Sequence, residues 1–491
     1  MGSPEAAGRA LTRRVIGIET EYGISYRHPA GSRELAPDDI ARYLFRPIVA
    51  KYSSSNIFMP NAARLYLDVG AHPEIATGEC DSLIQAMNHE RAGDLIVDEL
   101  AQKAEQILRE ELPSSSTPPR KGEGRVYLFK NNIDSVGNSY GCHENYLISR
   151  ETSLKKLGSR LVPFLVTRQL ICGAGCIIPA QGDQPAQWSI SQRADHVWEG
   201  VSSATTRSRP MINTRDEPHA DSSRFRRMHV IVGDSNMSEP SFALKVGSML
   251  LMLEMIEAGF ELPEVELRDP ITQIRQVSRD LSARPPLECV GEKNISALEI
   301  QQGYCAAAKR WLDYRQEEGT GTTNAQMVKV VDLWERALGA LESGDLSAVD
   351  REIDWVIKWN LLKRYQEKFD CALDDPRLAQ IDLTYHDIRP GRGLFLVLEA
   401  RGAVERWSSD AAIAQARDLA PETTRAHLRG RFLRCAEELH APVTVDWLRL
   451  KLNDPEPRMV ELGDPLSAHS TEVEELLALM DAHAQRWATS S

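Results

Sequence analysis

The sequence lacks an excess of basic residues. Its 491 residues include 58 Lys and Arg against 71 Asp and Glu, which gives a formal net charge of −13. Proteins that bind nucleic acid neutralise phosphates with a basic surface, so this balance argues against nucleic acid as the main partner. An acidic protein partner would have to be met by a local basic patch.

The sequence also lacks a long uncharged apolar run and closely paired cysteines. The most apolar region, residues 241–260, contains Lys245, Glu254 and Glu257, so it does not predict a membrane span. Of the eight cysteines only Cys172 and Cys176 lie close together, and their spacing is not that of a zinc-binding pair. We expect no signal peptide, and therefore predict reduced thiols in the cytoplasm.

The length and the 42% share of hydrophobic residues indicate a folded protein with more than one domain. Near residue 421 the pattern restarts with a predicted helix and then predicted strands. We therefore expect a large domain, residues 1–418, and a small C-terminal domain, residues 419–491. Trp447 lies in the small domain, and a tryptophan is usually a core residue unless its domain borders a site.

The segment of residues 61–80 predicts a strand with one polar face. Alternate side chains of a strand point the same way, so Arg64, Tyr66 and Asp68 share a face. The opposite face is predicted to contact the core through Leu65, Leu67 and Val69. The following turn delivers Glu74. This arrangement resembles the wall of a metal–phosphate site, although for the segment taken alone we prefer an edge strand with a solvated polar face.

Two other predicted strands carry candidate ligands. In residues 13–24, Glu19 and Glu21 share one face, and adjacent carboxylates favour either solvation or a bound cation such as Mg²⁺. In residues 142–148, His143 could bind a metal. A strand histidine is more often a hydrogen-bonded interior group, and we prefer that interpretation here.

Residues 191–229 are rich in arginine and contain no lysine. Arginine forms bidentate pairs with phosphates and carboxylates, so this segment predicts loops near an anionic site. Salt bridges with five interleaved acidic residues are the competing explanation for some of them. The seven arginines are Arg193, Arg207, Arg209, Arg215, Arg224, Arg226 and Arg227.

Several longer segments together resemble the Pup ligase family. They include GIETEYGI at residues 17–24, RLYLDVGAHPE at residues 64–74, SQRADHVWEG at residues 191–200 and TTRAHLRGRF at residues 423–432. The resemblance covers nearly the whole chain. The family belongs to the carboxylate–amine ligases related to glutamine synthetase and γ-glutamyl-cysteine ligase. It implies an α+β fold, with a curved, mostly antiparallel sheet packed by helices and a small C-terminal α/β domain.

A sibling family, the Pup deamidases and depupylases, shares this fold. The sibling has variants of the motifs at residues 18–21 and 67–70, and a long loop after the first strand. Only about 35 residues separate Ile24 from Pro60 here, and they include a predicted helix. We therefore favour the ligase. A non-catalytic scaffold that binds Pup or the proteasome is a further hypothesis, and a small-molecule amine ligase is a more remote one.

The resemblance also implies roles for particular residues. ATP and Mg²⁺ are the implied cofactors. Asp68 is implied to be the catalytic base. The remaining roles are Mg²⁺ ligation by Glu19, Tyr66 and Glu74, and ATP binding by Arg64, Thr77 and Trp447. Three positions depart from the family pattern, namely Ile75, Gly78 and Cys176.

The implied reaction needs ATP because a carboxylate is a poor electrophile. The γ-carboxylate of the C-terminal glutamate of Pup would form an acyl phosphate. A lysine of a target protein would then attack it and form an isopeptide bond, which marks the target for proteasomal degradation. A free lysine has a pKa of about 10.4, so a base must remove its proton.

Overall fold

A large sheet forms the centre of the computed structural model, which describes residues 10–27, 35–68, 70–111, 124–134, 137–203, 209–291 and 294–487. Within these residues the sheet has eight strands in the order β10-β11-β12-β7-β1-β5-β4-β3. All neighbouring pairs are antiparallel except β10 and β11. The strands are β1 (Ile16–Glu21), β3 (Asn56–Phe58), β4 (Arg64–Asp68), β5 (His72–Ala76), β7 (Cys142–Ser149), β10 (Glu199–Ser202), β11 (Pro210–Asn213) and β12 (Phe225–Val230).

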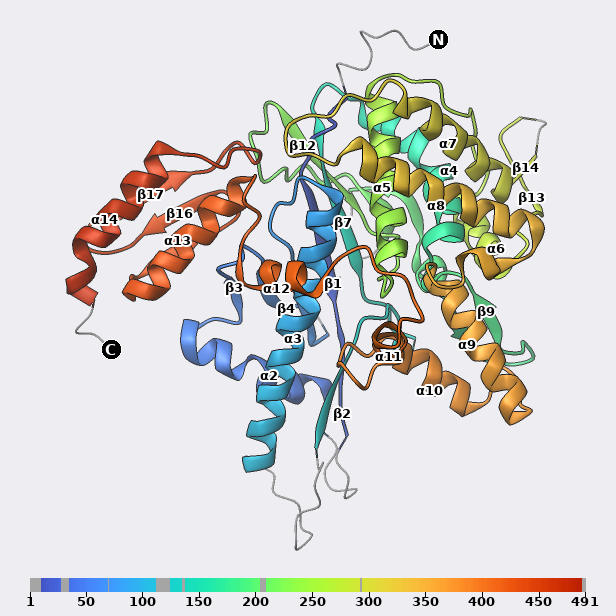
Figure 1. Ribbon diagram of the computed structural model, residues 1–491, viewed down its shortest axis with the longest axis horizontal. Coiled ribbons are helices and arrows are strands. Elements are labelled where there is room, and N and C mark those ends of the chain that lie inside the picture. The colour runs from blue at the N-terminus through green and yellow to red at the C-terminus, as the bar shows by residue number, and fades with distance from the viewer. Residues whose placement is uncertain are drawn as a thin grey trace, which may run out of the picture.

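One face of the sheet is covered by helices. Ile18 and Tyr146 point into a buried apolar core that also contains residues of α3 (Leu83–Glu111), α4 (Leu154–Cys172) and α5 (Glu239–Glu257). Helix α5 is buried on all sides, as expected for a helix that is apolar around its whole circumference. Figure 1 shows α4, α5, α7 and α8 stacked together beside β7 and β12. The opposite face of the sheet is left for polar side chains.

The remaining helices of the large unit follow α5 in the chain, and α6 to α10 add buried residues to the same core. The sequence signals for helix starts are met in α7 and α8, where Ser296 and Thr323 form capping boxes with Glu299 and Gln326. The helices are α6 (Pro270–Arg279), α7 (Ala297–Leu312), α8 (Asn324–Ser343), α9 (Asp354–Phe369), α10 (Pro376–Tyr385) and α11 (Leu394–Ala400), with short 3₁₀ helices η1 (Ala194–His196) and η2 (Leu346–Val349).

Smaller sheets lie around the centre. Strands β2 (Gly23–Arg27) and β6 (Arg125–Phe129) pair with each other, and α2 (Pro37–Tyr52) packs near β2. Two further pairs are β8 (Cys176–Ile178) with β9 (Gln187–Ser189), and β13 (Pro286–Leu287) with β14 (Ile295–Ser296). The β8–β9 pair is a hairpin that directly follows α4.

The predicted strand of residues 13–24 is two strands. The chain leaves the main sheet at Tyr22, whose hydroxyl donates to Asp94 Oδ1 at 2.8 Å and whose backbone N–H donates to Pro73. The predicted core position of Leu67 is also wrong, since its side chain is 36% exposed. Strand β3 pairs with β4 only as far as Tyr66, so Leu67 has a paired neighbour, Pro73 of β5, on one side only. Val69 lies outside the described residues.

The segment of residues 191–229, predicted as loops, is more regular than expected. It contributes β10, β11 and β12 to the main sheet, because Met211, Ile212 and Met228 supply buried apolar side chains. Arg207 of the arginine-rich segment lies outside the described residues.

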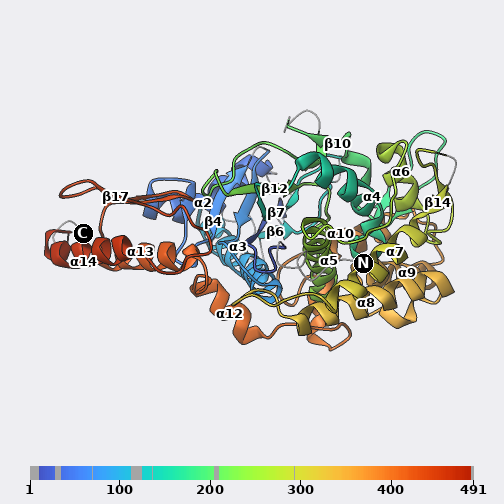
Figure 2. The ribbon, with the colours of Figure 1, turned by 90° about the horizontal axis from the view of Figure 1, so that it is seen from above.

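The C-terminal residues form a compact unit with its own apolar cluster. Leu428 and Phe432 pack with Leu450, Leu476 and Met480 in this cluster. Figure 2 shows the unit projecting from one end of the molecule. Its elements are α13 (Arg425–Leu439), β15 (Val443–Val445), β16 (Arg449–Leu452), β17 (Arg458–Glu461) and α14 (Thr471–Trp487), and α12 (Asp410–Asp418) precedes them.

The predicted fold class is confirmed: a mostly antiparallel sheet packed by helices, followed by a small unit of helices and strands. Among the residues that the structure describes, no helix combines the length and the apolar character needed to cross a bilayer.

Candidate active site

Strand register gathers acidic side chains on the polar face of the sheet. Glu19 on β1 lies opposite His143 on β7, and Glu21 lies opposite Glu74 on β5. Tyr66 on β4 also lies opposite Glu74, on its other side. Directly opposed residues project from the same face, so the antiparallel pairing of β7, β1, β5 and β4 concentrates these groups in one place.

Glu19 is the most highly coordinated of these carboxylates. It accepts a hydrogen bond from Asn145 Nδ2 at 3.0 Å, and its Oε2 lies 3.1 Å from His143 Nδ1. Arg227 Nη1 and His229 Nε2 both lie 3.8 Å from its carboxylate oxygens. Burial opposes ionisation of Glu19, but the hydrogen bond with His143 and the nearby His229 and Arg227 outweigh it and lower its pKa. Glu19 is therefore an anion.

Glu74 has the opposite character. Burial, together with the negative charges of Glu19 and Glu21, raises the pKa of Glu74 to about 9, although a hydrogen bond with Tyr66 opposes this. Burial and the charges of Glu19 and Glu74 also raise the pKa of the Tyr66 phenol. Three crowded carboxyl groups cannot all ionise without a counter-charge. A bound cation would supply that charge.

The geometry fits such a cation. Ligand atoms of Glu19, His143 and His229 lie within 4.8 Å of one another, and so do those of Glu21, Glu74 and His143. A Cβ atom at position 141, which is glycine, would lie 2.3 Å from His143 Nε2 and 2.8 Å from Glu21 Oε1. Gly141 therefore keeps open the space between these donors.

His229 provides a second indication. Its Nε2 is buried and has no hydrogen-bond partner among the described residues. Burial lowers the pKa of His229 to about 3, so the ring is neutral despite its position near Glu19. Divalent cations bind neutral imidazole nitrogens and carboxylate oxygens, and both kinds of ligand atom are present here. The other ligand atoms of the cluster are mostly carboxylate oxygens, which suit Mg²⁺.

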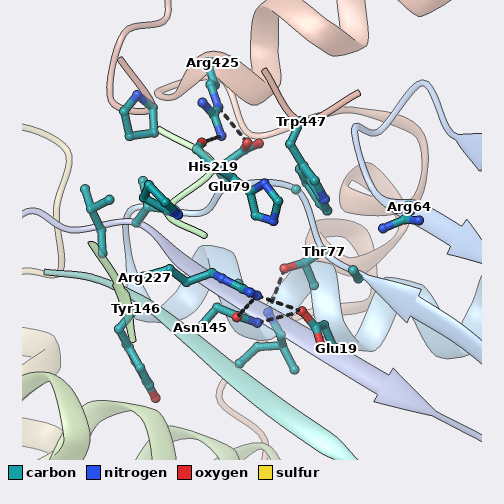
Figure 3. Close-up of a pocket in the computed structure, with 18 of the residues that line it drawn as sticks. Glu19, Arg64, Thr77, Glu79, Asn145, Tyr146, His219, Arg227, Arg425 and Trp447 are labelled. Carbon is teal, nitrogen blue, oxygen red and sulfur yellow. Dashed lines mark hydrogen bonds and ion pairs between the residues drawn. The ribbon is translucent and has the colours of Figure 1, made fainter. Parts of the chain in front are cut away.

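A cavity of about 260 Å³ adjoins Glu19 and extends to the C-terminal unit. Arg64, Thr77 and Trp447 line it, together with Glu19 and Tyr66. Figure 3 shows Trp447 and Arg64 on one side and Arg227 beside Glu19 at the base. The structure thus brings the three residues expected to bind ATP into one cavity.

Two of the ATP-binding candidates are positioned by neighbours in the large unit. Thr77 follows β5, and its hydroxyl accepts the backbone N–H of Ile18 at 3.1 Å. The Arg64 guanidinium lies 4.5 Å from the centre of the Tyr66 ring, and its Nε donates to Asn56 Oδ1 at 2.8 Å.

Trp447 is presented by the loop between β15 and β16 of the C-terminal unit. Its ring meets Phe58 edge-on, with 4.8 Å between the ring centres. The Arg429 guanidinium lies 5.0 Å from the Trp447 ring. An aromatic ring held in this way offers a flat surface on which a base can stack.

A second cavity, of about 1180 Å³, lies on the other side of the carboxylate cluster. Asp68, Glu21, His143 and His229 line it. Asp68 sits opposite His72 at the end of the β4–β5 pair. The sequence places Arg64, Tyr66 and Asp68 on one face, but Asp68 opens into a different cavity from the other two.

The arginine-rich segment has divided roles. Arg227 lies beside Glu19, and Arg193 lines the larger cavity. Arg215 pairs with the interleaved Glu217 at 2.6 Å, so salt bridging within the segment is the correct interpretation for Arg215. Arg224 pairs at 3.4 Å with Asp464, which lies outside the segment.

Sequence reasoning raised His143 as a possible metal ligand but preferred a hydrogen-bonded interior role, and it missed His229 and Asn145 as parts of this site. His143 and Asn145 lie two residues apart and therefore share one face of the predicted strand. That alternation was the signal in the sequence that could have placed both side chains in the site. His229 had no such signal, because its position beside Glu19 depends on the pairing of β12 with β7.

Comparisons with known proteins identify the family of this chain. A family model described as Pup-ligase protein matches residues 14–451. The chain belongs to the Pup ligase family. A Pup–protein ligase of Corynebacterium efficiens is 62% identical over 486 residues, covering 98% of this chain and 97% of the relative. The Pup–protein ligase of Mycobacterium bovis is 52% identical over 470 residues, covering 96% and 100%.

Solved structures of Pup ligases have the same fold. The crystal structure of the complex between Pup and its ligase PafA matches with a TM-score of 0.92 and 58% identity, covering 97% of this chain and 93% of that one. The structure of the Pup ligase PafA in complex with ADP matches with a TM-score of 0.83 and 59% identity, covering 91% and 94%. The family resemblance in the sequence is thereby confirmed.

Proposed function

We propose that this Pup ligase joins the γ-carboxylate of the C-terminal glutamate of Pup to a lysine side chain of a target protein. The reaction consumes ATP, proceeds through an acyl phosphate and marks the target for proteasomal degradation. One observation carries the proposal: two cavities adjoin at a carboxylate cluster that fits a divalent cation. That arrangement suits a reaction that activates one substrate beside a nucleotide and transfers it to another.

The smaller cavity is the proposed ATP site. Trp447 would stack on the base, while Arg64 and Thr77 would contact the nucleotide. Arg227 and Arg425 also line this cavity and would offset phosphate charge. The ligase of known structure that carries ADP supports nucleotide binding here.

Glu19, Tyr66 and Glu74 are the proposed Mg²⁺ ligands. When bound, Mg²⁺ would neutralise phosphate charge and hold the nucleotide in line for transfer. His143 and His229 would fix the orientation of Glu19, since both imidazoles lie against its carboxylate. The raised pKa of Glu74 means that this carboxyl group would give up a proton when it binds a metal.

Asp68 is the proposed base for the incoming lysine. The larger cavity that it lines is open to a protein substrate and lies apart from the proposed ATP site. A carboxylate at this position would take the ammonium proton as the amine attacks.

We also propose two domains, residues 1–418 and 419–491. The separate apolar cluster of the C-terminal unit supports this boundary. We propose a cytoplasmic location as well, in keeping with the free cysteines among the described residues.

One assay tests the function. Purified protein is incubated with Pup ending in glutamate, a lysine-bearing protein, Mg²⁺ and ATP, and we expect a covalent conjugate and ADP. If cleavage of a preformed conjugate were the main activity, the protein would be a depupylase. If no ATP turned over with every partner present, it would be a scaffold.

A further inference from the structure

Arg13 joins four segments of the chain that lie far apart in the sequence. Its Nε donates to Asp81 Oδ2 at 2.9 Å. Its Nη2 donates to the backbone carbonyl of Thr423 at 2.6 Å and to that of Leu466 at 3.2 Å. The Arg13 side chain is 21% exposed, and that of Asp81 is only 1% exposed. One guanidinium thus connects the segment before β1 and the segment after β5 to two segments of the C-terminal residues.

The two carbonyls fix the C-terminal unit at two separate points. Thr423 lies just before α13, whereas Leu466 lies in the loop between β17 and α14. The same loop meets the large unit again, because the Asp221 N–H donates to the Gly463 carbonyl at 2.9 Å. A contact at one point would let the unit pivot. Contacts at two points, made by the rigid fork of an arginine, restrict that rotation.

Asp81 supplies the counter-charge and is itself held in place. Its Oδ1 accepts the Thr423 hydroxyl at 2.7 Å, and its Oδ2 accepts the Thr320 hydroxyl. The Asp81 N–H donates to Gln85 Oε1 at 2.9 Å, at the start of α3. Thr423 is therefore bound at its carbonyl by Arg13 and at its hydroxyl by Asp81. A buried carboxylate of this kind depends on its cation, so the two residues act as a pair.

This pair lies beside the proposed ATP cavity. Val15, two residues after Arg13, lines the cavity, and so does Pro465, the residue before Leu466. Strand β1 starts directly after Val15 and carries Glu19, while the C-terminal unit supplies Trp447. Arg13 therefore ties the strand that carries Glu19 to the unit that carries Trp447.

We infer that Arg13 is a positioning residue for the nucleotide: it clamps the C-terminal unit against the start of β1 and so holds Trp447 at the proposed ATP cavity. The inference rests on the proposed function. Arg13 itself lines neither cavity, so its effect passes through the unit. Without the clamp, only the fraction of molecules with Trp447 in place binds nucleotide tightly, and the apparent affinity falls by that fraction.

The kinetics of Arg13→Ala test the inference, with Pup ending in glutamate and a lysine-bearing protein as substrates. KM for ATP should rise roughly tenfold, whereas KM for Pup and kcat at saturating ATP should stay near their wild-type values. Calorimetry should show a similar loss of affinity for ADP. Arg13→Lys should give an intermediate loss, because an ammonium group keeps the charge but cannot span the carboxylate and both carbonyls.

Arg392→Ala is the matched control. The Arg392 side chain is 15% exposed, its partner Asp387 is fully buried, and its Nη2 donates to the Val126 carbonyl at 3.1 Å. Burial and bonding thus resemble those of Arg13, but every one of these partners belongs to the large unit. Urea denaturation should show a loss of stability comparable to that of Arg13→Ala. The affinity for ADP should remain that of the wild type.

A double-mutant cycle tests whether Arg13 acts through Trp447. Arg13→Ala should weaken ADP binding much less in a Trp447→Ala background than in the wild type. If the loss were the same in both backgrounds, Arg13 would not act through Trp447, and the inference would be wrong.

Two further outcomes would overturn the inference: wild-type ADP affinity in Arg13→Ala, or an equal loss of affinity in Arg392→Ala. The second would show that general destabilisation is the cause. If Arg13→Ala failed to fold, Arg13→Lys and a cycle built on it would decide instead. Failure of the proposed function is distinguishable, because the wild type would then form no conjugate while ADP calorimetry would still compare the variants.

Discussion

Arg429 binds the carboxylate of Glu79 through two hydrogen bonds, from Nη1 at 2.7 Å and from Nη2 at 2.8 Å. Arg425 Nε adds a third at 2.8 Å. Glu79 follows β5 of the large unit, whereas both arginines belong to α13. Arg429 also donates to the Trp447 carbonyl at 2.8 Å. This ion-pair group therefore fixes one wall of the proposed ATP cavity.

Glu79→Gln should destabilise the protein and weaken nucleotide binding. It would leave Arg425 and Arg429 buried without their counter-charge, which costs about 3–5 kcal/mol for a broken buried pair. Urea denaturation would measure the free energy of unfolding, and calorimetry the affinity for ADP. The control is Glu474→Gln. It removes an exposed ion pair between Glu474 of α14 and Arg431 of α13, and should cost about 1 kcal/mol or less. Equal losses in the two variants would contradict the assignment.

Acid should weaken this same ion-pair group. Burial opposes ionisation of Glu79, but Arg429 and Arg425 outweigh it and lower its pKa from 4.5 to about 2. The folded pKa is below the unfolded value, so the stabilisation is present above about pH 4.5 and is lost as the pH falls toward 2. The stability difference between wild type and Glu79→Gln should therefore shrink over this range. A difference independent of pH would show that the carboxylate charge is not its source.

Glu19→Ala and His229→Ala should both reduce the Mg²⁺-dependent affinity for a non-hydrolysable ATP analogue, by roughly tenfold or more. Glu19 is a proposed ligand, and the unpaired His229 Nε2 lies 3.8 Å from its carboxylate. Calorimetry with and without Mg²⁺ separates the metal contribution from nucleotide binding itself. His427→Ala, a substitution on α13 outside both cavities, serves as the control. Full Mg²⁺ dependence in Glu19→Ala would remove Glu19 from the proposed metal site.

Asp68→Asn should fold and bind ADP normally, because Asp68 lines the larger cavity and not the proposed ATP cavity. Conjugation to lysine should slow by roughly 10²–10⁴-fold, the usual contribution of a positioned base. Hydroxylamine is largely unprotonated at neutral pH and needs no such base, so it should still trap activated Pup. Conjugation to lysine at the wild-type rate would refute the role of Asp68.

Gly78→Ala tests one of the three departures of this chain from the family pattern. A Cβ atom there would lie 3.3 Å from the Ala62 Cβ and 3.4 Å from the Ala426 Cβ, so both neighbours must shift slightly. The backbone of Gly78 is not left-handed, and alanine should stabilise the fold by about 0.4–1 kcal/mol through the unfolded chain. Thermal unfolding would measure this. A lower Tm would mean that the contact between the two units cannot relax.

The sequence predicted which side chains share a strand face better than it predicted how the strands assemble into sheets. Alternation placed Tyr66 and Asp68 correctly on one strand face, and Ile75, the residue after Glu74, lies in an apolar cluster. Alternation could not reveal that the chain turns out of the main sheet at Tyr22, because a buried hydrogen bond to Asp94 on a distant helix decides it.

The site needed information that no single segment contains. Five strands and the C-terminal unit contribute to it, and their register sets which side chains meet. The family resemblance supplied Trp447, although periodicity in that segment indicates only a core tryptophan. It did not supply the unpaired Nε2 of His229, since that is visible only when the surrounding atoms are in place.

Glu19 and Glu21 are two residues apart on β1. Glu19 lines the proposed ATP cavity, whereas Glu21 lines the larger cavity. At the rise of a strand this separation is only about 7 Å. A mixed anhydride formed at this boundary would already face the amine that consumes it, so neither unit has to move between activation and transfer. ADP and the finished conjugate would leave by different exits, and departure of one need not wait for the other.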